Sequence, residues 1–384
     1  MRSFSLLAGL SLLAGTVLAS PVDLPRRTTS TGKSVLYWGQ NGGGVEENND
    51  PGTYCNGTAG VDILILSFLY QYGNGVTVPG GLFGQTCQVL SNTGSAQGCD
   101  EVAAAVTTCQ ENGIQVFLSV GGSLGGYSLS SIEEAEAIGQ YLWDAYGNGV
   151  NSSVTRPFGD AIVNGWDFDI ENPDGSEYYP YLISTLRSNF ETDKENTYYI
   201  SGAPQCPIPE PNMGTMIEDS VFDYLWVQFY NNNNYTYPCA LGINGDAAFN
   251  YDEWESFIAT TNSSAAELFV GVPASPLGAN GLESGSVYYA TPEQLLPIIE
   301  SVSSNYSNFG GIMMWAAGFS DNNVNDGCTF AQEAETILRL GEVCSGSFTA
   351  TASLAPVVPT PTSGLSATAT ASATGTPVAA WGQV

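Results

Sequence analysis

The chain has 384 residues, a formal net charge of −30, eight cysteines and no histidine. The lack of histidine excludes a Ser-His-Asp or Cys-His nucleophilic site, a zinc-binding HExxH helix and a histidine-ligated haem. Because only 8 Lys and Arg stand against 38 Asp and Glu, we expect neither nucleic acid nor an anionic membrane as a partner. Acid–base chemistry must come from carboxylates, Tyr, Lys or Cys.

The N-terminal end has the features of a secretory signal. An apolar run from Phe4 to Leu18 follows Arg2, and the pattern ending at Ala19 predicts cleavage after that residue. The run is shorter than the ~20 residues that span a bilayer, and no later run is apolar enough to do so. Arg26-Arg27 is a weaker candidate site for removal of a short pro-segment. We therefore expect a secreted protein, located outside the cell or in the cell wall.

Apolar, β-rich runs recur along the chain, and several are apolar without interruption, which is typical of strands covered on both faces. The predicted strands are Ser34–Trp38, Val61–Phe68, Ile114–Val120, Val163–Ile170, Thr197–Ala203, Phe222–Phe229, Glu267–Pro273 and Gly310–Trp315.

Helical patterns lie between these strands. Apolar residues recur at helical spacing from Val102 to Cys109 and from Ala135 to Ala145, and Thr291-Pro292 is a helix start with Pro at the first position. Eight strands alternating with helices predict an α/β fold, a (β/α)8 TIM barrel over 34–344. An open doubly wound sheet is the alternative, but no GxGxxG turn follows the first strand.

The composition changes near the C-terminal end. From Ser345 to Val384 there is no charged residue, and Ser, Thr, Ala, Pro and Gly dominate. Such a segment buries too little apolar surface to offset its ordering entropy, so we expect a disordered tail of the kind that carries O-glycans. We expect the domains to be a signal peptide over 1–19, an N-terminal segment over 20–33, the barrel, and this tail over 345–384.

Eight cysteines in a secreted chain predict up to four disulfides. Spacing alone makes Cys87/Cys99 and Cys206/Cys239 natural pairs and leaves the others open. Five glycosylation sequons fit the secretory route and mark surface loops. They begin at Asn56, Asn151, Asn234, Asn262 and Asn305.

The fourth predicted strand carries three acids, Asp167, Asp169 and Glu171, that alternate with apolar residues. Side chains alternate faces along a strand, so the acids share one face at about 6–7 Å spacing. An edge strand with a solvated acidic face is the simpler interpretation. In a barrel, however, the acids point inward or lie at the carboxyl-end rim, where active sites are built. Repulsion then keeps at least one protonated, and Glu171 at the mouth suits a general acid.

These residues carry a resemblance. The segment Asn164–Glu171 resembles the DxxDxDxE signature of glycoside hydrolase family 18, the chitinases. Other strand ends resemble its plant and fungal class III, hevamine-like branch. They are the five-residue segments 37–41, 118–122 and 203–207, together with 226–231 and 311–315.

The resemblance implies substrate-assisted retaining hydrolysis. Glu171 would protonate the glycosidic oxygen and later activate water, while the N-acetyl group of the substrate attacks the anomeric carbon. Asp169 would hold the acetamido N–H and Tyr230 would donate to the acetamido oxygen, and Asp167 is a further candidate catalytic residue. No metal or cofactor is required.

The resemblance also implies substrate-binding roles. Gln228 would help to position the sugar, Trp315 would form an apolar floor under it, and Tyr37 would lie beside Asp169. Asn231 and Gly121 are further candidate substrate-binding residues. For the aromatic residues, ordinary core packing is the alternative.

This sequence departs from the family signature at one position, and it has one more pair of cysteines than the family disulfides use. The first acid of the signature is Asn164 here, which puts in doubt the proton coupling of Asp167. The family disulfides correspond to Cys55–Cys109, Cys87–Cys99 and Cys206–Cys239, which leaves Cys328–Cys344 as a fourth pair.

The sequence thus predicts a monomeric secreted endochitinase that acts on chitin or chitooligosaccharides. An endo-β-N-acetylglucosaminidase acting on N-glycans is an alternative, because it shares the acidic signature. A chitin-binding wall protein without catalysis is the other alternative, although such relatives usually lack the terminal Glu or its Asp partner.

Overall fold

The computed structural model describes residues 32–40, 45 and 47–346. The expected signal peptide, the Arg26-Arg27 site and nearly all of the C-terminal tail lie outside these ranges, as does Asn41 of the first strand-end motif.

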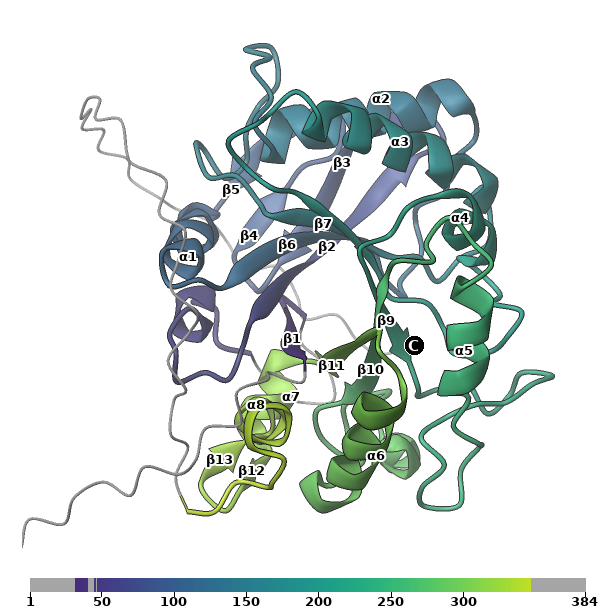
Figure 1. Ribbon diagram of the computed structural model, residues 1–384. Helices are drawn as coiled ribbons and strands as arrows, with labels where there is room; N and C mark the ends of the chain where they lie inside the picture. Colours follow the sequence, from purple (N-terminus) through teal and green to yellow (C-terminus); the bar gives the residue numbers. More distant parts are fainter. Residues whose placement is uncertain (1–31, 41–44, 46, 347–384) are drawn as a thin grey trace, which may run out of the picture.

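Eight parallel strands close into a barrel, because the first of them pairs with both the second and the last. Figure 1 shows these strands at the centre with helices outside them. The barrel strands, in order round the barrel, are β1 (Lys33–Trp38), β2 (Ile63–Gly73), β6 (Gln115–Gly121), β7 (Gly165–Asp169), β8 (Tyr199–Gly202), β9 (Tyr224–Gln228), β10 (Glu267–Pro273) and β11 (Phe309–Trp315). The predicted (β/α)8 barrel is confirmed.

The helices cover the outside of the barrel, and α2 and α3 lie side by side (Figure 1). They are α1 (Asp100–Glu111), α2 (Ile132–Tyr146), α3 (Tyr179–Phe190), α4 (Gly214–Asp219), α5 (Tyr251–Ile258), α6 (Pro292–Asn305), α7 (Ala317–Asn322) and α8 (Phe330–Leu340), with short 3-10 turns at Pro51–Tyr54, Ser176–Tyr178 and Glu283–Tyr288. The start of α6 is the one expected, since Thr291 and Gln294 form a capping box.

The sequence analysis missed an extension of the sheet. Past the barrel, β2 continues into an antiparallel meander with three further strands, and two short strands pair near α8. These elements are β3 (Val76–Phe83), β4 (Cys87–Val89), β5 (Ala96–Gln97), β12 (Val324–Asn325) and β13 (Cys328–Thr329). Their many glycines and turns give a weaker pattern than the buried barrel strands.

Side chains on the two faces of β7 have different surroundings, because side chains alternate between the faces of a strand. Trp166 packs outward against Trp143 of α2 and Phe190 of α3, with ring centroids 6.1 and 5.3 Å away. Phe168 contacts Tyr179 at the start of α3. The acids of β7 therefore face the barrel interior.

The lower interior is filled by aromatic rings from different strands. Phe117, Tyr199, Tyr224, Trp226 and Phe269 contact one another at centroid distances of 5.4 to 6.2 Å. The acids above them consequently stand on an apolar, closely packed base.

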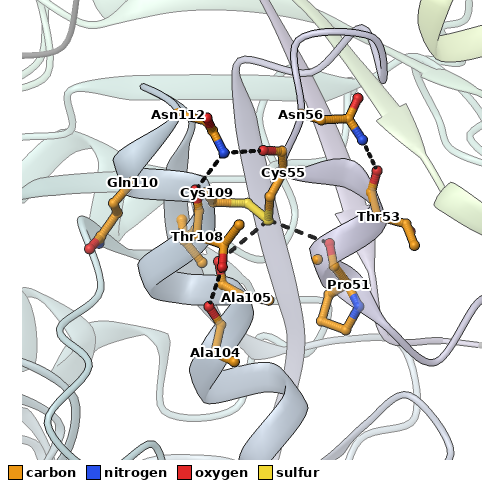
Figure 2. Close-up of a disulfide and its surroundings, with 12 residues drawn as sticks. Pro51, Thr53, Cys55, Asn56, Ala104, Ala105, Thr108, Cys109, Gln110 and Asn112 are labelled. Carbon is orange, nitrogen blue, oxygen red and sulfur yellow. Dashed lines mark hydrogen bonds between the residues drawn. A yellow bond between two sulfur atoms is a disulfide. The ribbon is translucent and has the colours of Figure 1, made fainter.

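The structure forms the four expected disulfides: Cys55–Cys109, Cys87–Cys99, Cys206–Cys239 and Cys328–Cys344. Figure 2 shows the first, which ties the loop before β2 to α1, beside the Asn112 amide that donates to the Cys55 carbonyl at 2.9 Å. All five sequon asparagines are exposed, and their glycosylation stays a prediction. Within the described ranges, none of the helices combines the length and apolar character needed to cross a bilayer.

The disulfides give a first prediction. Cys55–Cys109 joins residues 54 apart and Cys87–Cys99 joins residues 12 apart. Loop entropy then assigns them about 4 and about 3 kcal/mol of stability, respectively. We expect the C55A/C109A variant to lose about 1 kcal/mol more unfolding free energy than C87A/C99A in denaturant titrations. Equal losses, or the reverse order, would contradict this.

Candidate active site

Three acids form a row along β7 toward the carboxyl end of the barrel. Asp167 and Asp169 lie within the strand and are 0% and 5% exposed, respectively. Glu171 lies two residues beyond the strand and is partly exposed. The row therefore runs from the packed interior to the mouth.

Asp167 is the innermost acid, and three hydroxyls donate to it. The partners are Tyr37 at 2.7 Å, Ser119 at 2.6 Å and Ser201 at 2.8 Å. The Trp226 indole N–H in turn donates to the Tyr37 hydroxyl at 2.8 Å. Burial raises the pKa of Asp167, and these hydrogen bonds oppose the rise because they favour the ionised form.

Tyr37 lies close to both inner acids. The sequence analysis put it beside Asp169 as a substrate-binding residue. Its hydroxyl bonds Asp167, the negative charge of Asp169 also raises the pKa of its phenol, and its side chain is only 1% exposed. The buried phenol connects the aromatic rings of the lower barrel interior, through Trp226, to the innermost acid.

Asp169 is the middle acid. The Gln228 side-chain amide donates to its Oδ1 at 3.0 Å and to the Ala203 carbonyl at 2.9 Å. Burial raises the pKa of Asp169 well above its usual value, and the negative charges of Glu171 and Asp167 raise it further.

Glu171 is the outermost acid. The Gln205 side-chain amide donates to its Oε2 at 3.0 Å, and its backbone N–H donates to the Tyr127 hydroxyl at 2.9 Å. Burial raises the pKa of Glu171 to about 7, while the Gln205 hydrogen bond opposes the rise. With Asp169 raised as well, the pair holds at least one proton at neutral pH.

Tyr230 follows β9 and is 5% exposed. Burial and the negative charges of Asp169 and Glu171 raise the pKa of its phenol well above the usual value. The hydroxyl therefore stays protonated beside the acids and is available as a donor.

Trp315 ends β11 and is partly exposed. Its ring packs on Tyr37 and Phe68 at centroid distances of 5.6 and 5.8 Å, and it also contacts the small cluster that contains Tyr230. The structure thus places Trp315, Tyr230 and the acids together.

Asn231 directly follows Tyr230. It has a φ of +63°, and its amide donates to the Ala279 carbonyl.

Gly121 ends β6 and pairs with Asp169 of β7. Its φ is +112°, and a Cβ there would lie 2.1 Å from the Asp169 carbonyl oxygen. The next residue, Gly122, donates its N–H to the same oxygen at 2.7 Å. Glycine is required here because the two backbones approach so closely.

Asn164 lies apart from the row of acids. Its Oδ1 accepts the Val116 N–H at 2.8 Å and the Gln110 amide at 2.9 Å, before β7 begins. The hydrogen-bond partners of Asn164 differ from those of Asp167, and the effect of this departure on the proton coupling of Asp167 stays a prediction. The amide oxygen accepts these bonds without a negative charge.

Sequence reasoning did not single out several residues that bond to the acids. Ser119 and Gln205 fall inside strand-end motifs that were recognised only as segments, and polar residues at such ends are a usable signal. Trp226 likewise falls inside the recognised segment 226–231, whereas Ser201 carries no comparable signal, because Ser is common in ordinary strands. Tyr127 lies in a loop whose path depends on the whole fold.

A barrel whose carboxyl end carries a graded row of acids, with an aromatic floor, defines a glycoside hydrolase type of site. Residues 33–320 match the family described as glycosyl hydrolases family 18. The chain belongs to this family.

Two endochitinases are similar to this chain in sequence over most of its length. Endochitinase 2 of Metarhizium anisopliae is 57% identical over 342 residues, which cover 89% of this chain and 81% of that protein. Acidic endochitinase SE2 of Beta vulgaris is 37% identical over 287 residues, which cover 74% and 86%, respectively.

Solved structures of similar fold have more than one described role. A chitinase from Ipomoea carnea aligns with a TM-score of 0.61 and 29% identity over 79% of this chain and 99% of that one. A xylanase and α-amylase inhibitor from Scadoxus multiflorus aligns with a TM-score of 0.59 and 28% identity over 76% and 94%. The fold alone therefore does not decide the activity.

The close approach at Gly121 gives a second prediction. In G121A the new Cβ pushes β6 away from Asp169, so we expect unfolding free energy to fall by about 2 kcal/mol or more and hydrolysis to slow at least ~10-fold. Gly57 is the control, because a Cβ there meets no atom within 4 Å. Thermal unfolding and kinetics that are the same for G121A and G57A would contradict the assignment.

Proposed function

We propose that this protein is an endochitinase that cleaves β-1,4 links between N-acetylglucosamine units. The observation that carries the proposal is the row of acids on β7, in which the outermost acid has a pKa of about 7. The endochitinase names of relatives at 57% and 37% identity support the same substrate class.

The first step follows from the raised pKa of Glu171. Its protonated carboxyl donates to the glycosidic oxygen, the bond from that oxygen to the anomeric carbon breaks, and the leaving sugar departs with the proton. The acetamido carbonyl oxygen of the substrate bonds to the anomeric carbon and forms an oxazolinium ion. Asp169 accepts the acetamido N–H and balances the positive charge, while Tyr230 donates to the acetamido oxygen.

The second step reverses the roles. The ionised Glu171 takes a proton from water, the water oxygen bonds to the anomeric carbon, and the oxazolinium ring opens. Two displacements on one carbon give net retention, so the product is the β-anomer. Gln228 keeps Asp169 aimed at the acetamido group, and Trp315 supplies an apolar face for the sugar ring.

We further propose that the protein is secreted and acts as a monomer outside the cell or in the wall. Four disulfides among the described residues support an oxidising compartment. The proposed organisation is a signal peptide over 1–19, a short segment over 20–33, the catalytic barrel over 34–344 and a Ser/Thr-rich tail over 345–384.

Replacement of the acid tests the mechanism. E171Q keeps the shape of the side chain but has no proton to donate, so we expect hydrolysis of chitin oligomers to fall by at least ~10³-fold. E136Q on the exposed face of α2 is the matched control and should retain wild-type rates. Proton NMR of fresh wild-type product should show the β-anomer.

An active E171Q variant or an α-anomeric product would refute the mechanism. A high-mannose glycoprotein included as a second substrate distinguishes endo-β-N-acetylglucosaminidase activity from chitin hydrolysis. Wild-type binding to chitin without any cleavage would instead indicate the non-catalytic alternative.

The pH dependence gives a further prediction. Glu171 must be protonated in the free enzyme, and burial raises its pKa from 4.5 to about 7. We therefore expect kcat/KM to be high below that value and to fall as pH rises through it. A profile still rising above pH 8 would contradict the assignment of Glu171 as the acid.

A further inference from the structure

Two glutamines lie side by side and each donates to one acid. Gln205 and Gln228 are paired through their backbones, and the Gln228 N–H donates to the Pro204 carbonyl at 2.8 Å. The side chain of Gln205 bonds Glu171 and that of Gln228 bonds Asp169, both at 3.0 Å. The position of Gln205 therefore bears directly on the proposed proton donor.

Gln205 does not belong to a barrel strand. β8 ends at Gly202, so Gln205 lies in the loop 203–213. Pro207, Pro209 and Pro211 alternate through this loop, and proline has no N–H with which to extend a ladder. Other groups must fix the loop.

Glu210 provides this support from inside the loop. One carboxylate oxygen accepts the Gln205 N–H at 3.1 Å, and the other accepts the N–H groups of Asn212, at 2.7 Å, and Met213. The residue is only 7% exposed. Burial raises the pKa of Glu210 to about 7, while the hydrogen bonds from the N–H groups of Met213, Asn212 and Gln205 oppose the rise because they favour the carboxylate.

The outer side of the same loop is fixed separately. Cys206 forms the disulfide with Cys239, and its carbonyl accepts from the side chains of Asn250 at 3.0 Å and Trp254 at 2.9 Å. These contacts hold the residue after Gln205. Glu210 holds the N–H of Gln205 itself.

We propose that Glu210 is a positioning residue for the reaction: it fixes the loop 203–213 so that Gln205 donates to Glu171. The inference rests on the proposed function, since it assigns a support for the acid of that reaction. Neither residue needs to touch the substrate for this role.

The consequence has a definite sign. A donor to Glu171 favours its ionised form, so the Gln205 hydrogen bond offsets part of the rise that burial causes. Loss of this bond raises the pKa of Glu171 and moves the alkaline fall of kcat/KM to higher pH. The same bond stabilises the carboxylate that must take a proton from water in the second step.

The test compares pH profiles of kcat/KM on a chitin oligomer. Q205L removes the donor, and we expect its alkaline limb to move up by about one pH unit. E210Q places an amide against backbone N–H donors, releases Gln205 and should shift the limb in the same direction. The double variant Q205L/E210Q should shift no further than Q205L, because Glu210 acts through Gln205.

E333Q is the matched control for the loss of a buried carboxylate. Glu333 on α8 is 2% exposed and accepts the Cys344 N–H at 2.7 Å, away from the acids of β7. We expect its melting temperature to fall with no shift of the limb. If E210Q does not fold, E210D, whose shorter side chain reaches fewer of the donors, should give a partial shift.

An E210Q or E210D limb at the wild-type pH, with only stability reduced, would overturn the proposal. Fully additive shifts in the double variant would overturn it as well. Failure of the proposed function has a different signature, because wild-type protein would then not hydrolyse chitin oligomers at any pH.

Discussion

The structure depends on one electrostatic constraint, the placement of three carboxyl groups on one face of a single central strand. Beneath Asp167 the barrel is filled by aromatic rings, so water cannot solvate the inner acids. Charge in such a place must be balanced by donors or removed by protons. The two strands beside β7 each supply a serine hydroxyl, and the amides of Gln228 and Gln205 come from β9 and from the loop after β8.

These donors make the three acids unlike one another. Asp167 accepts from three hydroxyls, Asp169 from one amide and Glu171 from another amide at the mouth. The innermost acid thus has three side-chain donors, and each of the outer two has one. In the proposed mechanism, proton transfer falls to the outer acid, Glu171, which gives its proton to the glycosidic oxygen. The same mechanism needs no histidine, because burial raises the pKa of Glu171 to about 7.

Sequence patterns predicted the barrel strands, three of the helices and the inward row of acids, because alternation and continuous apolar runs are local signals. They missed β3 to β5, where glycines and short strands weaken the period. The hydrogen bond from Tyr37 to Asp167 was not predicted, since it depends on the relative register of β1 and β7 across the barrel. Glu210 shows the same limit: its donors come from a proline-rich loop whose path no local pattern defines.

The protonation state of the row is the most direct test of this account. Carboxyl ¹³C NMR of wild type, with E171Q and D169N for assignment, would follow the three groups from acid to neutral pH. We predict that at pH 7 at least one of the three carboxyls remains protonated, whereas exposed acids titrate near pH ~4. Three carboxyls that are all ionised at pH 7 would contradict the account.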